Sequence, residues 1–428
     1  VSLEAGMAAS HLKVFLSLGS QKVFSLMGAM ALSIALARLL GPSDYGTYVF
    51  ISALIPLAAL PLTGGLPQLL TREIAKHIHK QAAEHYLGVV RRSIKLNAIV
   101  TAFVVLTCTI GMALTEAPSK SFLFFLALLC VPFFALEATH NGIIRGLHRV
   151  NLAELPKQVV QPLLMAASLI VLVALGTLTT ATAISALIFA SAGAALVSVL
   201  IYKAIQPSFP KSAVAVEGDD LLLKSLASFS AIALITSFNT QIGILVLGTL
   251  DQNTDAASLR IAERAGQVVA MPLAIINLMI APRLVTAFQN GDSAKLQEIA
   301  KRAAIVSFGL TVPITLTLWL FGDWLIGVSF GEAYVKAALP AVITVAAGQT
   351  MGAFLGSVWP LLTMTGHEKR ALGGLGISFT LNVLLCLWLA PAYGATGAAV
   401  ATAVSLVTCK LLFSIEVKKL LSINSRVF

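Results

Sequence analysis

Charged residues are scarce in this chain of 428 residues. Only 11% of them are Asp, Glu, Lys or Arg, whereas 57% are hydrophobic. Soluble globular domains carry about 25% charged residues, so this chain has too few to cover a water-facing surface. Apolar runs long enough to cross a hydrocarbon core of about 30 Å recur along the sequence instead. The composition therefore excludes an ordinary soluble protein and predicts one that crosses a membrane many times.

Cysteine is also sparse, and its four positions form no motif. The cysteines lie far apart in apolar runs, without a Cys-x-x-Cys pair. We interpret them as small packing residues and expect no disulfide framework, metal site or cofactor. The sequence lacks an Asp-x-Asp motif, and the loops expected outside the cell are short. A membrane-embedded polysaccharide enzyme would be expected to carry such a carboxylate motif or a large loop outside the membrane. We therefore predict that the protein is not an enzyme.

The apolar runs predict an all-α polytopic membrane protein with about twelve transmembrane helices in two pseudo-symmetric six-helix bundles. The first run is too long for a cleaved leader, so we expect a retained helix. We expect an N-terminal bundle over residues 1–205, a cytoplasmic linker over 206–224 and a C-terminal bundle over 225–428. The predicted spans are 14–40, 47–70, 94–114, 121–145, 155–176, 181–202, 225–250, 258–282, 303–327, 337–365, 371–391 and 394–415.

The two halves share a short pattern that supports an internal repeat. Pro67–Thr71 reads PQLLT, and Pro282–Thr286 reads PRLVT. Each closes an apolar helix and is followed by a basic amphipathic segment and another apolar run. A repeat of about half the chain's length is typical of transporters built from two similar bundles.

The net charge of +10 points to membrane topology and not to nucleic acid. Lys and Arg gather in alternate loops, as the positive-inside rule requires of cytoplasmic loops. We therefore expect a multi-pass protein of the cytoplasmic (inner) membrane with both termini cytoplasmic. The cations that this topology leaves on the other side are Arg38, Lys120, Arg260, Arg264 and Lys336.

Three segments carry a resemblance to a known family. They are ARLLGPSDYGTY at 37–48, GLPQLLTREIA at 65–75 and YGATGAAVAT at 393–402. Together they resemble the polysaccharide-export flippases, the O-antigen-type carriers of lipid-linked oligosaccharides, in a superfamily that also holds multidrug exporters and the lipid II flippase. The resemblance implies translocation of a polyprenyl-pyrophosphate-linked oligosaccharide by alternating access. We expect a proton or sodium ion as the coupling ion, and the polysaccharide polymerase machinery is a candidate partner.

Polar and ionisable residues inside the predicted spans are the candidate binding residues. An ionisable side chain at mid-bilayer costs at least about 2.5–3.5 kcal/mol, so each one calls for an explanation. Arg and Lys satisfy a pyrophosphate through charge-assisted hydrogen bonds, while amides and hydroxyls suit sugars. We expect these residues to line a wet, cationic cavity between the halves. The candidates are Lys22, Arg38, His140, Asn141, Arg145, Asn239, Gln241, Arg260, Arg264 and Gln267.

Two carboxylates in the spans are candidates for coupling. Glu137 and Glu263 each lie on a helical face with cations or amides, and either could carry a coupling ion. His140, three residues after Glu137, could relay a proton.

Structural roles stay open for several of these residues. Lys22 could extend its ammonium to the interface. Arg260, Glu263 and Arg264 could form a structural ion-pair set. Arg145 could be an interfacial anchor, and Arg38 could cap a helix C-terminus.

Other functions compete with oligosaccharide translocation. A multidrug antiporter of the same superfamily needs an acidic, aromatic cavity for cationic drugs, whereas the intramembrane excess here is positive and aromatics total 7%. A lipid II-type flippase generally has two further helices, for which this chain has no room. An integral-membrane polysaccharide enzyme and a non-transporting scaffold complete the alternatives.

Overall fold

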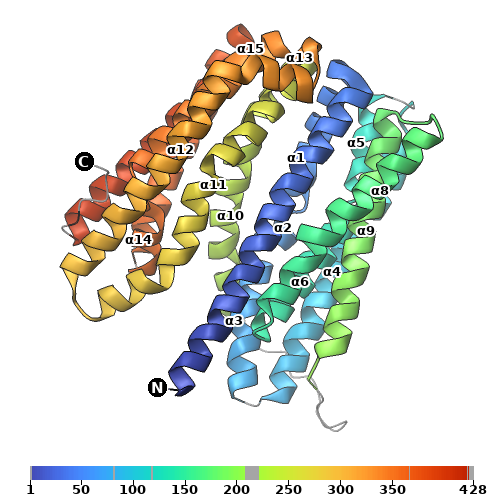
Figure 1. The fold of residues 1–428 in the computed structure, drawn as a ribbon. Coiled ribbons are helices and arrows are strands. Elements are labelled where there is room, and N and C mark those ends of the chain that lie inside the picture. Colours follow the sequence, from blue (N-terminus) through green and yellow to red (C-terminus); the bar gives the residue numbers. More distant parts are fainter. Residues whose placement is uncertain are drawn as a thin grey trace. The chain divides into compact units, whose positions relative to one another are not determined.

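The structure, a computed structural model, describes residues 2–80, 82–116, 119–207, 221–365, 367–421 and 423, and these residues form helices without any strand. The predicted linker falls largely outside them, at 208–220. The helices are α1 Ser2–Ala58, α2 Leu60–Thr63, α3 Leu66–His79, α4 Ala83–Ala113, α5 Lys120–Leu128, α6 Val131–Gly146, α7 Val150–Leu155, the π-helical turn η1 Pro156–Val160, α8 Gln161–Ala174, α9 Thr180–Ile205, α10 Leu221–Thr249, α11 Asn253–Gln289, α12 Ser293–Ser329, α13 Glu332–Phe354, α14 Val358–Met364 and α15 Glu368–Leu421 (Figure 1).

The predicted all-α polytopic membrane fold is confirmed. In the described part of the chain, nine helices are long and apolar enough to cross a membrane, and α10 adds a shorter apolar stretch at Ala233–Thr249. One of the nine, α15, covers two predicted spans in succession, and α1 covers the first predicted span and the start of the second. Large apolar side chains are exposed on many helices, as expected where lipid replaces water. Examples are Phe103, Ile170, Trp319 and Trp388, which are 69%, 71%, 62% and 74% exposed.

A glycine with positive φ bends each of the two longest helices. Gly41 in α1 has φ 77° and ψ 172°, and Gly394 in α15 has φ 54° and ψ −134°. Glycine alone tolerates such values without a Cβ clash. Pro42 follows the first bend and Pro391 precedes the second. At the second bend, Asp255 Oδ1 accepts a 3.0 Å hydrogen bond from the backbone N–H of Ala395, which satisfies a donor freed by the break.

Prolines also divide the second and fifth predicted spans. The second breaks at Ala59 and again at Gly64 and Gly65, which separates the short helix α2 from α3. In the fifth, α7 passes through the π-helical turn that begins at Pro156 before α8 continues. Proline has no N–H to donate, and π-helical turns absorb such local irregularities.

Contacts along the chain divide it into two compact units. The first comprises residues 1–33 and 51–237, and the second comprises 34–50 and 238–428. The segment around the bend at Gly41 therefore packs with the C-terminal part of the sequence, although it lies near the amino end.

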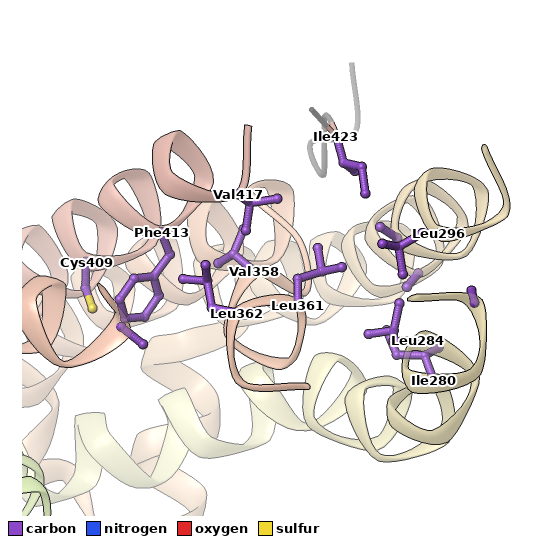
Figure 2. Close-up of a cluster of buried hydrophobic side chains, with 14 residues drawn as sticks. Ile280, Leu284, Leu296, Val358, Leu361, Leu362, Cys409, Phe413, Val417 and Ile423 are labelled. Carbon is purple, nitrogen blue, oxygen red and sulfur yellow. The ribbon is translucent and has the colours of Figure 1, made fainter. Parts of the chain in front are cut away.

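Each unit has its own apolar core. In the first, α3, α4 and α6 bury Leu66, Leu70, Ile74, Tyr86 and Ile143. In the second, the adjoining ends of α11 and α12 pack against α14 and the end of α15. Figure 2 shows this cluster, with Ile280 and Leu284 of α11 near Leu296 of α12, and Leu361 and Leu362 of α14 near Phe413 and Val417 of α15.

We expect Gly46→Ala to destabilise the protein by about 1–3 kcal/mol, because overpacking is costly. A Cβ at residue 46 would lie 1.8 Å from the carbonyl oxygen of Asn253. Thermal unfolding in detergent, followed by a thiol-reactive dye that reports exposure of the four buried cysteines, measures the change. Gly309→Ala is the matched control, because a Cβ at 309 meets nothing within 4 Å. Equal melting temperatures for the two variants would contradict the close approach.

Candidate functional sites

In the first unit, Glu154 of α7 is the centre of a polar cluster against α6. Its carboxylate forms an ion pair with Arg145, and its Oε2 accepts a 2.6 Å hydrogen bond from Gln158. Asn141 donates to Glu154 Oε1 at 3.3 Å and to the carbonyl oxygen of Ala153 at 2.7 Å. Arg145 is thus neutralised within its own unit, and it ties α6 to the segment that follows it.

Glu137 and His140 lie on α6 within the first unit and are both buried. Glu137 is 5% exposed, and its Oε1 has no hydrogen-bond donor among the described residues. His140 uses Nδ1 to donate a 2.8 Å bond to the carbonyl oxygen of Leu136. Its ring packs edge-on against that of Tyr202, whose hydroxyl lies 3.4 Å from that of Tyr86. The histidine ring is therefore held by two contacts, whereas one carboxylate oxygen of Glu137 accepts no hydrogen bond from the described residues.

Gln21 of α1 reaches this part of the first unit, whereas its neighbour Lys22 is exposed. Gln21 Nε2 donates to the carbonyl oxygen of Asn151 at 3.4 Å. The side-chain oxygens of Gln21, Asn151 and Gln158 are all buried without a donor among the described residues, as is Glu137 Oε1. The helices α1, α6, α7 and η1 therefore each contribute a buried oxygen that accepts no hydrogen bond from the described residues.

In the second unit, Arg260 joins α11 to α10. Its Nη1 pairs with Glu263 Oε2 at 2.9 Å, and its Nη2 donates to Gln241 Oε1 at 3.2 Å. The side chains of Arg260 and Glu263 are 15% and 19% exposed. Three of the predicted site residues are thus in direct contact, with their charges balanced.

Arg264, one turn along α11, is only partly satisfied. Its Nη1 donates to Gln267 Oε1 at 3.1 Å, but its buried Nε has no acceptor among the described residues. An unmet buried donor costs about 1–3 kcal/mol, more when charged. Arg264 therefore keeps one buried N–H donor without a partner in the described part of the structure.

Two further candidates have structural partners inside the second unit. The backbone oxygen and Oδ1 of Asn239 accept bonds of 3.1 and 2.8 Å from the side chain of Asn382, which is fully buried on α15. Arg38 donates to the carbonyl oxygens of Ser329 and Val328, the last residues of α12. These contacts correspond to the helix-capping alternative for Arg38, because carbonyls at a helix C-terminus lack intrahelical donors.

Sequence reasoning missed Glu154, Asn382 and Lys410. Glu154 lies four residues before Gln158 at the edge of a predicted span, so it resembled an interfacial charge. Asn382 is a single amide inside an apolar run. Lys410, which lies within the last predicted span, is a partly buried cation on α15 beside Gly352 of α13. The available signal was that each is a polar residue within a predicted span or at its edge.

No group of three or more His, Cys, Asp or Glu side chains could hold a metal ion in the described part of the chain. Both polar clusters are instead built from carboxylates, guanidinium groups and amides. Such clusters can bind anions, sugars, protons or hard cations.

A family model described as "Polysaccharide biosynthesis protein" matches residues 12–288, well over half of the chain. The protein belongs to this family. The match covers Glu137 and the polar cluster around Glu154 in the first unit, and Arg260 and Arg264 in the second. It confirms the resemblance found in the sequence.

Other proteins are similar over most of their length. The "Probable low-salt glycan biosynthesis flippase Agl15" of Haloferax volcanii is 23% identical over 386 residues, which cover 86% of this chain and 75% of the relative. Among solved structures, the lipid II flippase MurJ in an inward closed conformation has a TM-score of 0.75 at 15% identity, covering 94% of this chain and 87% of MurJ. An inward-facing multidrug resistance transporter of the MATE family has a TM-score of 0.74 at 14% identity, covering 93% and 94%. At these identities the structures show a shared fold.

In this member of the polysaccharide biosynthesis family, we expect the Arg145–Glu154 pair to stabilise the first unit. Arg145→Gln should cost about 1–2 kcal/mol, because it leaves the largely buried carboxylate of Glu154 without its charged partner. Glu154→Gln should cost less, because the Arg145 side chain that it leaves unpaired is 43% exposed. The double variant should cost less than the sum of the two, since both partners are then neutral. Thermal unfolding in detergent measures all three, and strict additivity would contradict the pairing.

Proposed function

We propose that this protein is a flippase for a polyprenyl-pyrophosphate-linked oligosaccharide, an O-antigen or other surface polysaccharide repeat unit. It would move the lipid-linked sugar from the cytoplasmic to the outer leaflet of the inner membrane by alternating access. The match to the polysaccharide biosynthesis family over residues 12–288 carries this proposal. The resemblance to a glycan flippase along 86% of the chain supports it.

The chemistry of the second unit fits the charged end of such a substrate. A guanidinium group binds phosphate oxygens through a planar fork of donors, and Arg264 has a buried Nε without an acceptor among the described residues. Gln267 and Gln241 lie beside the two arginines and offer amides to sugar hydroxyls. The polyprenyl tail can stay in lipid, because it needs no shelter from water. In this proposal Arg264 contacts the pyrophosphate, and Arg260 positions the polar groups around it.

The predicted cationic cavity concerns the space between the two units, and it stays a prediction. Lys22, which is exposed, is a further cation that such a cavity would use. Arg145 contributes little positive charge to it, because Glu154 neutralises this side chain in the first unit.

The unused acceptors of the first unit support coupling to an ion. Glu137 is a buried carboxyl group with one oxygen free of donors among the described residues. Such a group must take up a proton or a cation, or else keep a charge in a dry environment at high cost. We propose that Glu137 carries the coupling proton or sodium ion, with His140 as its neighbour in the relay. Glu263 is the weaker candidate, because Arg260 already pairs with it.

A multidrug antiporter is the runner-up, because the MATE structure is as similar in fold as MurJ. The partly satisfied arginine distinguishes the two functions, since a cationic drug would be repelled by Arg264. We also propose that the protein is not an enzyme, that it resides in the inner membrane with both termini cytoplasmic, and that it works beside the polysaccharide polymerase.

Proteoliposomes that contain the purified protein and an undecaprenyl-pyrophosphate-linked oligosaccharide test the proposed transport. A membrane-impermeant glycosidase should cleave more of the sugar with protein than without it, because flipping brings the inner pool to the surface. Arg264→Gln should lower the initial rate at least tenfold through loss of the phosphate contact. Arg149→Gln, at an exposed arginine of the first unit, is the control and should keep the rate. Equal rates with and without protein would contradict the proposal.

Glu137→Gln should remove the dependence of flipping on an imposed proton or sodium gradient, because an amide cannot exchange a proton and binds cations poorly. Rates measured with and without each gradient give the result. Glu137→Asp keeps the carboxyl group and should keep part of the coupling. If the glutamine variant responds to the gradients as the unaltered protein does, Glu137 is not the coupling group.

A further inference from the structure

A groove lies between α11 and α12 of the second unit, close to the turn that joins them. Its volume is about 760 Å³. The two helices form an antiparallel hairpin (Figure 1). The turn follows Gln289, and Asp292 caps α12 by accepting a 2.9 Å bond from the N–H of Lys295. The groove is formed entirely within one unit, so its shape depends on this hairpin alone.

One half of the groove is apolar and open. Ile276, Met279 and Val306 line it, and the last two are each 52% exposed. Its floor includes Ile280 and Ala303, which also belong to the buried cluster of the second unit; Figure 2 shows Ile280 within that cluster. The hairpin thus packs one side against the core of the second unit, and the apolar side chains on the outer side of the groove stay exposed.

The other half of the groove is basic. Arg283, Lys295 and Arg302 line it, with Glu298 as the single carboxylate. Glu298 pairs with Arg302 at 2.5 Å, whereas Arg283 and Lys295 have no ion pair among the described residues. The lining therefore has an excess of two positive charges. These two cations are available to an anionic ligand.

The change from apolar to basic coincides with the end of a membrane-spanning segment. Ile276 and Met279 lie inside the candidate span Asn253–Ala281, and Arg283 lies just beyond its end. A ligand that fits both halves must have an acyl chain on the membrane side and a negative headgroup on the other. Basic pockets between transmembrane helices bind lipid headgroups in this way.

We propose that the α11–α12 groove binds an anionic glycerophospholipid, with its phosphate between Arg283 and Lys295 and an acyl chain along Ile276, Met279 and Val306. The bound lipid is a resident of the bilayer and not the transported substrate. The proposal is therefore independent of the flippase function, and either can fail without the other. A lipid bound there would stabilise the turn that connects the two long helices.

Native mass spectrometry of the purified full chain tests this proposal by titration with phosphatidylglycerol and phosphatidylethanolamine of identical acyl chains. We expect tighter binding of phosphatidylglycerol. The double variant Arg283→Gln/Lys295→Gln should weaken phosphatidylglycerol binding about ten- to thirtyfold, because it removes the attraction of two cations for the anionic headgroup. Binding of phosphatidylethanolamine should not change. The matched control Lys418→Gln/Lys419→Gln removes the same charge from the end of α15 and should keep the preference.

A second variant tests the apolar half without removing charge. Val306→Trp places a large side chain in the open groove, and it should weaken phosphatidylglycerol binding while leaving any binding of glycerol 3-phosphate unchanged. Should either variant fold poorly, crosslinking of a photoactivatable phosphatidylglycerol to the unaltered protein keeps the test valid. Its adducts should map to α11 and α12.

Four outcomes would overturn the proposal. They are equal affinity for the two lipids, equal losses in the basic double variant and its control, crosslinks confined to other helices, and displacement of phosphatidylglycerol by farnesyl pyrophosphate at much lower concentration. The last outcome would assign the groove to the transported lipid instead.

Discussion

Lipid offers no hydrogen bonds, so every polar group inside the apolar helices depends on a partner from the protein. This constraint explains most of the side-chain contacts within each unit. Glu154 gathers Arg145, Asn141 and Gln158 around one carboxylate in the first unit. Arg260 joins Glu263 and Gln241 in the second. These bonds connect neighbouring helices and satisfy charges that an apolar environment would otherwise penalise.

In the described part of the chain, two buried ionisable side chains do not have partners for all of their hydrogen-bonding groups. Glu137 keeps a buried oxygen without a donor, and Arg264 keeps a buried N–H without an acceptor, among the described residues. One is an acidic group in the first unit and the other a basic group in the second. A transporter needs groups whose partners change during its cycle, and such groups must be unsatisfied in some states. The two residues therefore stand apart from fully paired neighbours such as Glu154 and Arg260.

The segment that carries the strongest family resemblance is a structural element of the second unit. Gly41 bends α1, Arg38 satisfies carbonyls at the end of α12, and Gly46 lets α1 approach the backbone of Asn253. Tyr45 packs edge-on against Tyr334, whose hydroxyl donates to the carbonyl oxygen of Ala37. The motif thus fastens an early part of the chain to helices formed much later.

The sequence alone determined the helical membrane fold, the approximate spans and the family, because apolar length, helix breakers and short motifs are local properties of the chain. It also placed Arg260, Glu263 and Gln241 among the site residues, and these are in contact. Only the tertiary structure decided that Arg38 caps α12, that Glu154 neutralises Arg145 and that residues 34–50 pack with the second unit. A polar side chain's partner is set by how helices far apart in sequence pack together, and neither hydropathy nor spacing within one helix records that packing.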